Sequence, residues 1–189
     1  VACAAMANAL QPSRPPALLP SALPRNPGIP LDLREVAKMR VNRSAVERRA
    51  ATLGTRRTVK KDWQAAWLVQ AVRLMDLTTL QGDDTPANVK RLCAKARRPI
   101  RADLLEALGL AGRDIRVGAV CVYHNLVPTA VEALRGSGIP VAAVSTGFPA
   151  AQTPMDLKVE EIRRSVIAGA EEIDVVISRV HVLGENWKG

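Results

Sequence analysis

Aromatic side chains are scarce in this sequence, which has one Phe, one Tyr and three Trp among 189 residues. A hydrophobic core must therefore consist of Val, Leu, Ile and Ala, a composition typical of buried parallel strands covered by helices. No apolar run approaches the roughly 20 residues that cross a bilayer. The sequence therefore predicts a soluble protein, and a hydrophobic share of 48% excludes general disorder.

Several common site motifs are also absent. The cysteines Cys3, Cys93 and Cys121 form no C-x-x-C pair, so we expect neither a disulfide framework nor a metal site. Reduced thiols favour a cytoplasmic location. No G-x-G-x-x-G follows a predicted strand, and neither a P-loop nor a G-x-S-x-G elbow occurs, so no nucleotide site or serine nucleophile is indicated.

The net charge of +9 raises the question of nucleic-acid binding. The excess of Lys and Arg lies within residues 1–100, whereas residues 101–189 carry more acidic than basic side chains. No aromatic side chains interleave with the basic pairs, which are typical of solvated helix faces. We therefore do not expect nucleic-acid binding, although a basic RNA-associated protein remains an alternative.

Residues 1–30 are rich in Pro and Ala and contain no acidic residue. Dense prolines prevent a continuous helix, so we expect a disordered extension there and a folded domain over residues 31–189. In the following segment Ser44 and Glu47 form a capping-box pattern, which predicts a helix start. Trp63 and Trp67 stand at helical spacing, and we interpret them as core packing.

Short aliphatic runs alternate with amphipathic segments from residue 74 onward. Predicted strands cover residues 74–80, 117–123, 141–146 and 172–177, and helices follow Thr85-Pro86 and cover residues 127–134 and 157–168. This alternation predicts an α/β fold whose four parallel strands are neighbours in chain order. A (β/α)8 TIM barrel needs eight strands, so the pattern corresponds to about the first four β/α units plus N-terminal helices, or to an open doubly wound sheet.

Polar residues mark the carboxyl ends of these strands, where active sites of parallel β/α proteins gather. Asp174 interrupts an apolar strand, and burial there would raise the pKa of its carboxyl group toward a role in proton transfer. A strand-end carboxylate bound to backbone amides is the alternative. Asp76 has a similar position, and Cys121 is more typical of a small buried hydrophobic residue than of a nucleophile.

Four motifs in order resemble deoxyribose-phosphate aldolase, a class I aldolase family. They comprise residues 74–80 with 83–85, 119–123, 146–149 and 169–176, and residues 56–67 resemble the animal-type N-terminal region of the family. The resemblance implies reversible cleavage of 2-deoxy-D-ribose 5-phosphate to acetaldehyde and glyceraldehyde 3-phosphate through a Schiff base, without metal or cofactor. It also implies that Asp174 is catalytic in proton transfer, that Asp76, Thr78 and Cys121 line the substrate, and that the partner is a small phosphorylated sugar. Assembly into a homo-oligomer is a further possibility that the sequence does not decide.

The same resemblance places the Schiff-base lysine on a sixth strand, beyond this N-terminal portion. None of the lysines present lies at the end of a predicted strand, where a desolvated amine would be needed; they are Lys38, Lys60, Lys61, Lys90, Lys95, Lys158 and Lys188. We therefore expect this chain to have no Schiff-base lysine and to be inactive alone. A non-catalytic truncated half-barrel is the alternative.

Overall fold

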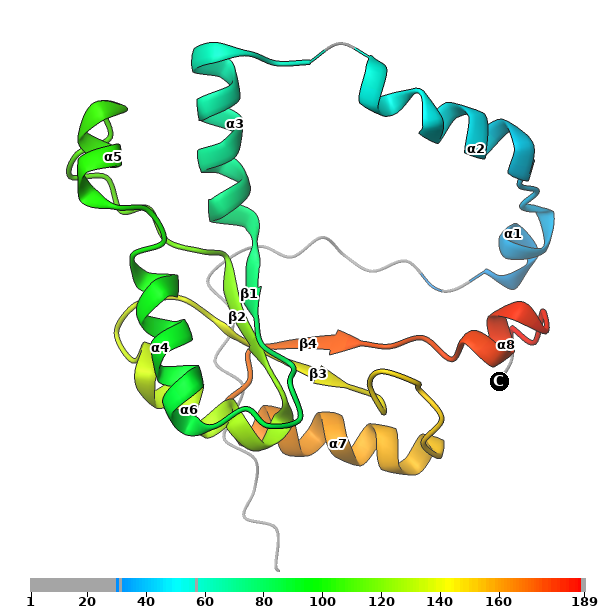
Figure 1. Ribbon diagram of the computed structural model, residues 1–189. Coiled ribbons are helices and arrows are strands. Elements are labelled where there is room, and N and C mark those ends of the chain that lie inside the picture. The colour runs from blue at the N-terminus through cyan, green and yellow to red at the C-terminus, as the bar shows by residue number, and fades with distance from the viewer. Residues whose placement is uncertain (1–29, 31, 57, 188–189) are drawn as a thin grey trace, which may run out of the picture. The chain divides into compact units, whose positions relative to one another are not determined.

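The computed structural model describes residue 30 and residues 32–56 and 58–187. The expected disordered extension thus lies almost wholly outside the described residues. The chain divides into two compact units, residues 1–40 and 41–189. The first contains α1 (Leu33–Lys38). The elements of the second are labelled in Figure 1: α2 (Arg43–Ala51), the 3-10 turn η1 (Leu53–Thr55), α3 (Lys61–Leu74), β1 (Asp76–Thr78), α4 (Pro86–Arg97), α5 (Ala102–Ala107), β2 (Ala119–Val122), the 3-10 turn η2 (His124–Leu126), α6 (Val127–Leu134), β3 (Val141–Ser145), α7 (Met155–Ile167), β4 (Glu172–Val175) and α8 (Arg179–Leu183).

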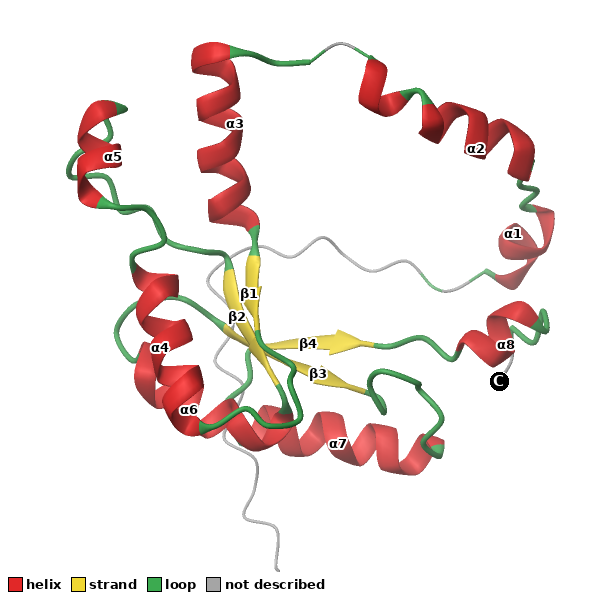
Figure 2. Ribbon diagram, in the orientation of Figure 1, coloured by secondary structure: helices red, strands yellow, loops and turns green. Residues whose placement is uncertain are grey.

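The strands form one parallel sheet in the order β1-β2-β3-β4 (Figure 2). This confirms the predicted alternation of strands and helices and the predicted neighbour order. The strands are shorter than the sequence predicted, and β1 in particular begins only after α3 has continued through Leu74. Helices α5 and α8 were not predicted, since neither carries a long apolar period.

The larger hydrophobic core lies on the helix-covered face of the sheet. Val120, Val122 and Val141 from the strands pack with Val89 and Cys93 of α4 and with residues of α6. All five of these side chains are almost fully buried. The core is aliphatic, as the composition predicted. Helix α7 contacts β3 and β4 of the same sheet.

A smaller cluster occupies the opposite face. It consists of Ala119, Cys121, Ala142 and Val144, with Leu80, Tyr123 and Phe148 packed against it. The rings of Tyr123 and Phe148 meet edge to face, with 6.0 Å between their centroids. This face carries every site residue that the sequence predicted, as the strand register shows below.

Two expectations for the N-terminal helices are wrong. Trp63 and Trp67 are 74% and 61% exposed, so they do not pack into a core; α3 has no buried residue. Helix α2 is capped by Asn42, whose side chain accepts from the Ala45 amide. Glu47 forms an ion pair with Arg43 instead of a capping box, because Ser44 already lies inside the helix.

Candidate active-site face

The register of the sheet brings the four predicted site residues to one face. Asp76 pairs with Ala119 and Thr78 with Cys121 across β1 and β2, while Asp174 pairs with Val144 across β3 and β4. Side chains of paired residues in a parallel sheet point to the same side, and residues two apart on a strand share a face. We call this group, with Glu172, the carboxylate face.

Cys121 lies at the centre of the carboxylate face and is 2% exposed. Burial raises the pKa of its thiol to about 11, and the negative charges of Asp174 and Asp76 add to this effect, while a hydrogen bond with Thr78 opposes it. At neutral pH the thiol is therefore protonated. This agrees with its interpretation as a small buried residue and excludes thiolate chemistry there.

The two aspartates are more accessible than the sequence predicted. Asp174 and Asp76 are both exposed, so the burial expected for Asp174 is not observed. The reason is geometric, since both stand on the outer strands of the described sheet, where each strand has a neighbour on only one side. Water and a ligand can therefore reach both carboxylates.

Sequence reasoning missed Glu172, the third carboxylate of this face. Burial raises the pKa of its side chain, and the charges of Asp76 and Glu171 act in the same direction. Glu172 stands two residues before Asp174 on β4, and Ala142 is its partner on β3. The period of two within a strand could have identified it, because it places Glu172 and Asp174 on one side.

Other polar residues at the strand ends serve the structure. The Thr79 hydroxyl donates to the Asp84 carboxylate, at 2.9 Å and 2.8 Å from its two oxygens. The Thr146 hydroxyl accepts from the Val176 amide at 2.8 Å and so ties the end of β3 to the segment after β4. These hydrogen bonds fix the loops around the carboxylate face.

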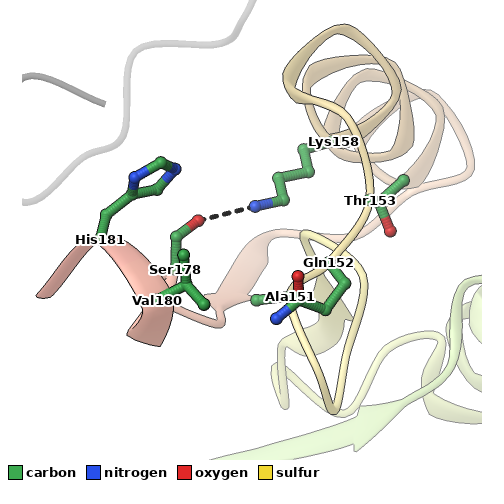
Figure 3. Close-up of a pocket in the computed structure, with 7 residues that line it drawn as sticks. All are labelled: Ala151, Gln152, Thr153, Lys158, Ser178, Val180 and His181. Atoms are coloured by element: carbon green, nitrogen blue, oxygen red, sulfur yellow. Dashed lines mark hydrogen bonds between the residues drawn. The ribbon is translucent and has the colours of Figure 1, made fainter. Parts of the chain in front are cut away.

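A polar cavity of about 110 Å³ lies between the loop after β3, helix α7 and the segment after β4. The residues that line it are shown in Figure 3: Ala151, Gln152, Thr153, Lys158, Ser178, Val180 and His181. Lys158 is 6% exposed, and its ammonium donates to the Ser178 hydroxyl at 2.8 Å. No sequence pattern signals this contact, because it depends on how α7 lies relative to the segment after β4.

Within residues 30, 32–56 and 58–187 no group of three or more His, Cys, Asp or Glu side chains is placed to hold a metal ion. Among the same residues, no helix combines the length and the apolar character that crossing a membrane requires.

Comparison with known proteins places these features in a family context. The chain is 56% identical to deoxyribose-phosphate aldolase of Bos taurus over 163 residues, which are 85% of this chain and 51% of the relative. It is 54% identical to deoxyribose-phosphate aldolase of Homo sapiens over 165 residues, 86% of this chain and 52% of the relative. The chain thus spans about half the length of these relatives. No family model matches it.

Solved structures agree on the fold. A structure from Coccidioides immitis, provisionally assigned as deoxyribose-phosphate aldolase, is 27% identical with a TM-score of 0.50 and covers 62% of this chain and 40% of its own. A provisionally assigned deoxyribose-phosphate aldolase from Toxoplasma gondii has a TM-score of 0.50 at 18% identity over 67% of this chain and 43% of its own. The predicted resemblance is confirmed: over most of its residues this chain is a relative of the deoxyribose-phosphate aldolases, matching about half of their length.

Proposed function

We propose that the carboxylate face forms part of a Schiff-base aldolase site for 2-deoxy-D-ribose 5-phosphate. The observation that supports this most directly is the gathering of Asp76, Glu172 and Asp174 around one protonated thiol on a single face of the sheet. The reaction breaks a carbon–carbon bond to give acetaldehyde and glyceraldehyde 3-phosphate. Cleavage of the bond and release of acetaldehyde each require a proton transfer. Carboxylates accessible to substrate are suited to that task.

We assign Asp174 to proton transfer. It is exposed on β4 and shares its face with Glu172, a second carboxylate whose pKa is raised by desolvation and by the charges of Asp76 and Glu171. Asp76 and Thr78 stand on β1, so Cys121 lies between them and Asp174 on the sheet. We propose that they line the substrate there, because a carboxylate and a hydroxyl can bind sugar hydroxyl groups. Cys121 contributes a neutral wall, because its thiol stays protonated.

The reaction also requires an amine, since the carbanion left by carbon–carbon cleavage must be delocalised into an iminium. None of the lysines described within residues 41–187 stands on a strand: Lys158 is buried in the cavity beside Ser178, and the exposed ones belong to helices α3 and α4 or immediately precede α3. We therefore propose that the 189-residue polypeptide does not form the imine by itself. The alternative hypothesis, a half-barrel with no catalytic role, predicts the same absence of aldolase activity.

Trapping with borohydride tests the amine requirement. The 189-residue polypeptide is incubated with 2-deoxyribose 5-phosphate and borohydride, its intact mass is measured, and acetaldehyde release is followed in parallel. We expect neither a stable adduct nor acetaldehyde. An adduct on Lys158, with acetaldehyde release abolished by Asp174→Asn, would contradict the proposal and establish a site within this chain.

A fused protein tests the role of Asp174. Residues 1–187 are joined to the part of the bovine relative that this chain does not match, and the aldolase rate is measured. Asp174→Asn should lower that rate by about 10²–10⁴-fold. Cys121→Ala should retain most of it, because no step passes through the thiol. Equal activity of the Asp174→Asn variant and its parent would remove Asp174 from the mechanism.

The setting of the reaction is proposed with it. The substrate is a small phosphorylated sugar, the location is the cytoplasm, and a homo-oligomer is compatible with the exposed apolar side chains of the sheet edges. A basic RNA-associated protein stays a hypothesis to be tested by the salt dependence of RNA binding, and no observation on the carboxylate face favours it.

A further inference from the structure

Lys158 is a buried cation without a carboxylate partner. Its side chain reaches from α7 toward Ser178, which immediately precedes α8, and His181 of α8 lies close by (Figure 3). None of the ion pairs among the described residues includes Lys158. An ammonium group has three donors, and the Ser178 hydroxyl satisfies one of them.

Glu161, on the same side of α7, forms no ion pair with Lys158. Glu161 stands one turn after Lys158, and its carboxylate accepts from the Gly147 amide at 3.0 Å. Asp156, two residues before Lys158, points to a different side of the helix and is exposed. A buried charge that forms no ion pair among the described residues is costly, so a bound anion would compensate it.

The cavity suits a small oxyanion. Its volume of about 110 Å³ is several times what one water molecule needs, so a tetrahedral anion fits. Its lining adds groups that can donate to anionic oxygens, namely the hydroxyls of Thr153 and Ser178, the Gln152 amide and the His181 imidazole. The Val180 side chain, 61% exposed, forms the rim.

We propose that the cavity around Lys158 binds a small oxyanion of the phosphate class, with Lys158 as its charged anchor and Ser178 as its hydrogen-bonding partner. The site is separate from the carboxylate face, since its residues come from the loop after β3, from α7 and from the segment after β4. It therefore does not depend on the proposed aldolase reaction. The anion could be free inorganic phosphate or the phosphate group of an ester, and the two sources are distinguished below.

Calorimetric titration of the full 189-residue chain with inorganic phosphate tests the site directly. We expect binding in the millimolar range or tighter, and binding about tenfold weaker or absent in Lys158→Met, because a charge-assisted hydrogen bond is lost. Lys90→Met is the matched control, since Lys90 is exposed on α4 and should leave binding unchanged. No binding of phosphate to the unaltered chain, or equal loss in both variants, would overturn the proposal.

Two further arms keep the result interpretable. Lys158→Arg keeps the charge and should keep most of the binding even if Lys158→Met folds poorly, and circular dichroism reports the fold of each variant. Competition between inorganic phosphate and 2-deoxyribose 5-phosphate separates the two sources. Equal competition by both means that the cavity takes the phosphate group alone, whereas binding of the ester only, insensitive to Lys158→Met, would place the phosphate elsewhere and contradict the site.

Discussion

At the scale of single residues, Cys121 couples the stability of the sheet to alkaline pH. The pKa of the buried thiol is raised to about 11, whereas an unfolded thiol ionises near 9. Stability is therefore fully present below pH 9 and falls as pH rises toward 11. A rise of this size corresponds to about 3 kcal/mol when ionisation is complete, of which about 2 kcal/mol is reached by pH 10.5.

Denaturant unfolding at pH 8 and at pH 10.5 measures this coupling. The unaltered chain should lose about 2 kcal/mol more than Cys121→Ala between these pH values, because the variant has no thiol to ionise. Lys and Tyr groups titrate alike in both proteins and cancel in the difference. Identical pH dependence would show that Cys121 ionises as readily in the fold as in the unfolded chain.

The residues of the carboxylate face were predictable to different degrees. Asp76, Thr78, Cys121 and Asp174 could be located from the sequence because the ends of short aliphatic strands are local features and because the family resemblance singles out these positions. The exposure of Asp174 could not, since it depends on which elements cover the edge strands. The burial of Lys158 was equally hidden, because an amphipathic pattern does not show which neighbouring element meets a helix.

At the scale of secondary structure, the loop after β3 depends on Gly147. This glycine has a φ of +76°, and a Cβ placed on it would collide with the Thr153 hydroxyl and lie 3.0 Å from the Thr153 Cβ. Its amide also donates to Glu161, which anchors the loop to α7. A side chain at this position must therefore both strain the backbone and displace Thr153, a residue of the Lys158 cavity.

Gly147→Ala should destabilise the fold by about 3 kcal/mol, measured by urea unfolding. Gly136→Ala separates the two causes, because Gly136 has a similar φ of +74° but open space around its Cβ position. That variant should cost only about 1 kcal/mol. Equal losses would mean that the backbone conformation alone, without the contact to Thr153, accounts for the effect.

The start of α4 was predicted correctly from Thr85 and Pro86. The Thr85 side chain accepts from the Asn88 amide at 3.3 Å, so Thr85→Ala should lower the free energy of unfolding by about 1 kcal/mol. Thr85→Ser retains the accepting oxygen and should cost little. If both variants lose the same amount in thermal unfolding, the methyl group of Thr85 and not its hydroxyl stabilises the helix start.

The remaining elements show why local patterns succeed and fail. The strands were found because β2 and β3 are near-continuous aliphatic runs, and their burial on both faces selects such runs. The ends of β1 were misplaced because nothing in the sequence around Leu74 stops α3. The Trp stripe was assigned to a core because periodicity shows that a helix has an apolar side but not that another element covers it.

At the scale of the whole molecule, both outer strands of the described sheet have one unpaired side. β1 and β4 pair only with β2 and β3 among the described residues, and Val175 on β4 is 53% exposed. Unpaired strand edges that carry exposed apolar side chains promote association between chains. The 189-residue polypeptide should therefore associate with itself as its concentration rises.

Sedimentation velocity measures this association. The average mass should increase with concentration, and Val175→Lys should reduce the increase because a lysine at a strand edge opposes pairing. Val166→Lys is the control, since Val166 is similarly exposed, at 43%, but lies on α7 away from the edge. A polypeptide that stays monomeric at every concentration would show that the edges are protected in solution.

The order of the strands in the sheet is also their order along the chain. Each strand after the first pairs with a strand that has been synthesised before it. The sheet can therefore grow by one β/α unit at a time during translation. Most of the core formed by α4, α6 and the first three strands can assemble once β3 has emerged, and Ala170 and Ile173 join it only when the chain around β4 has been made. A synonymous codon change that slows translation after β3 should therefore leave the folding of these first three strands and their helices intact. Slowing between β1 and β2 should instead prolong the time during which the apolar side chains of β1 and α4 are exposed to chaperones.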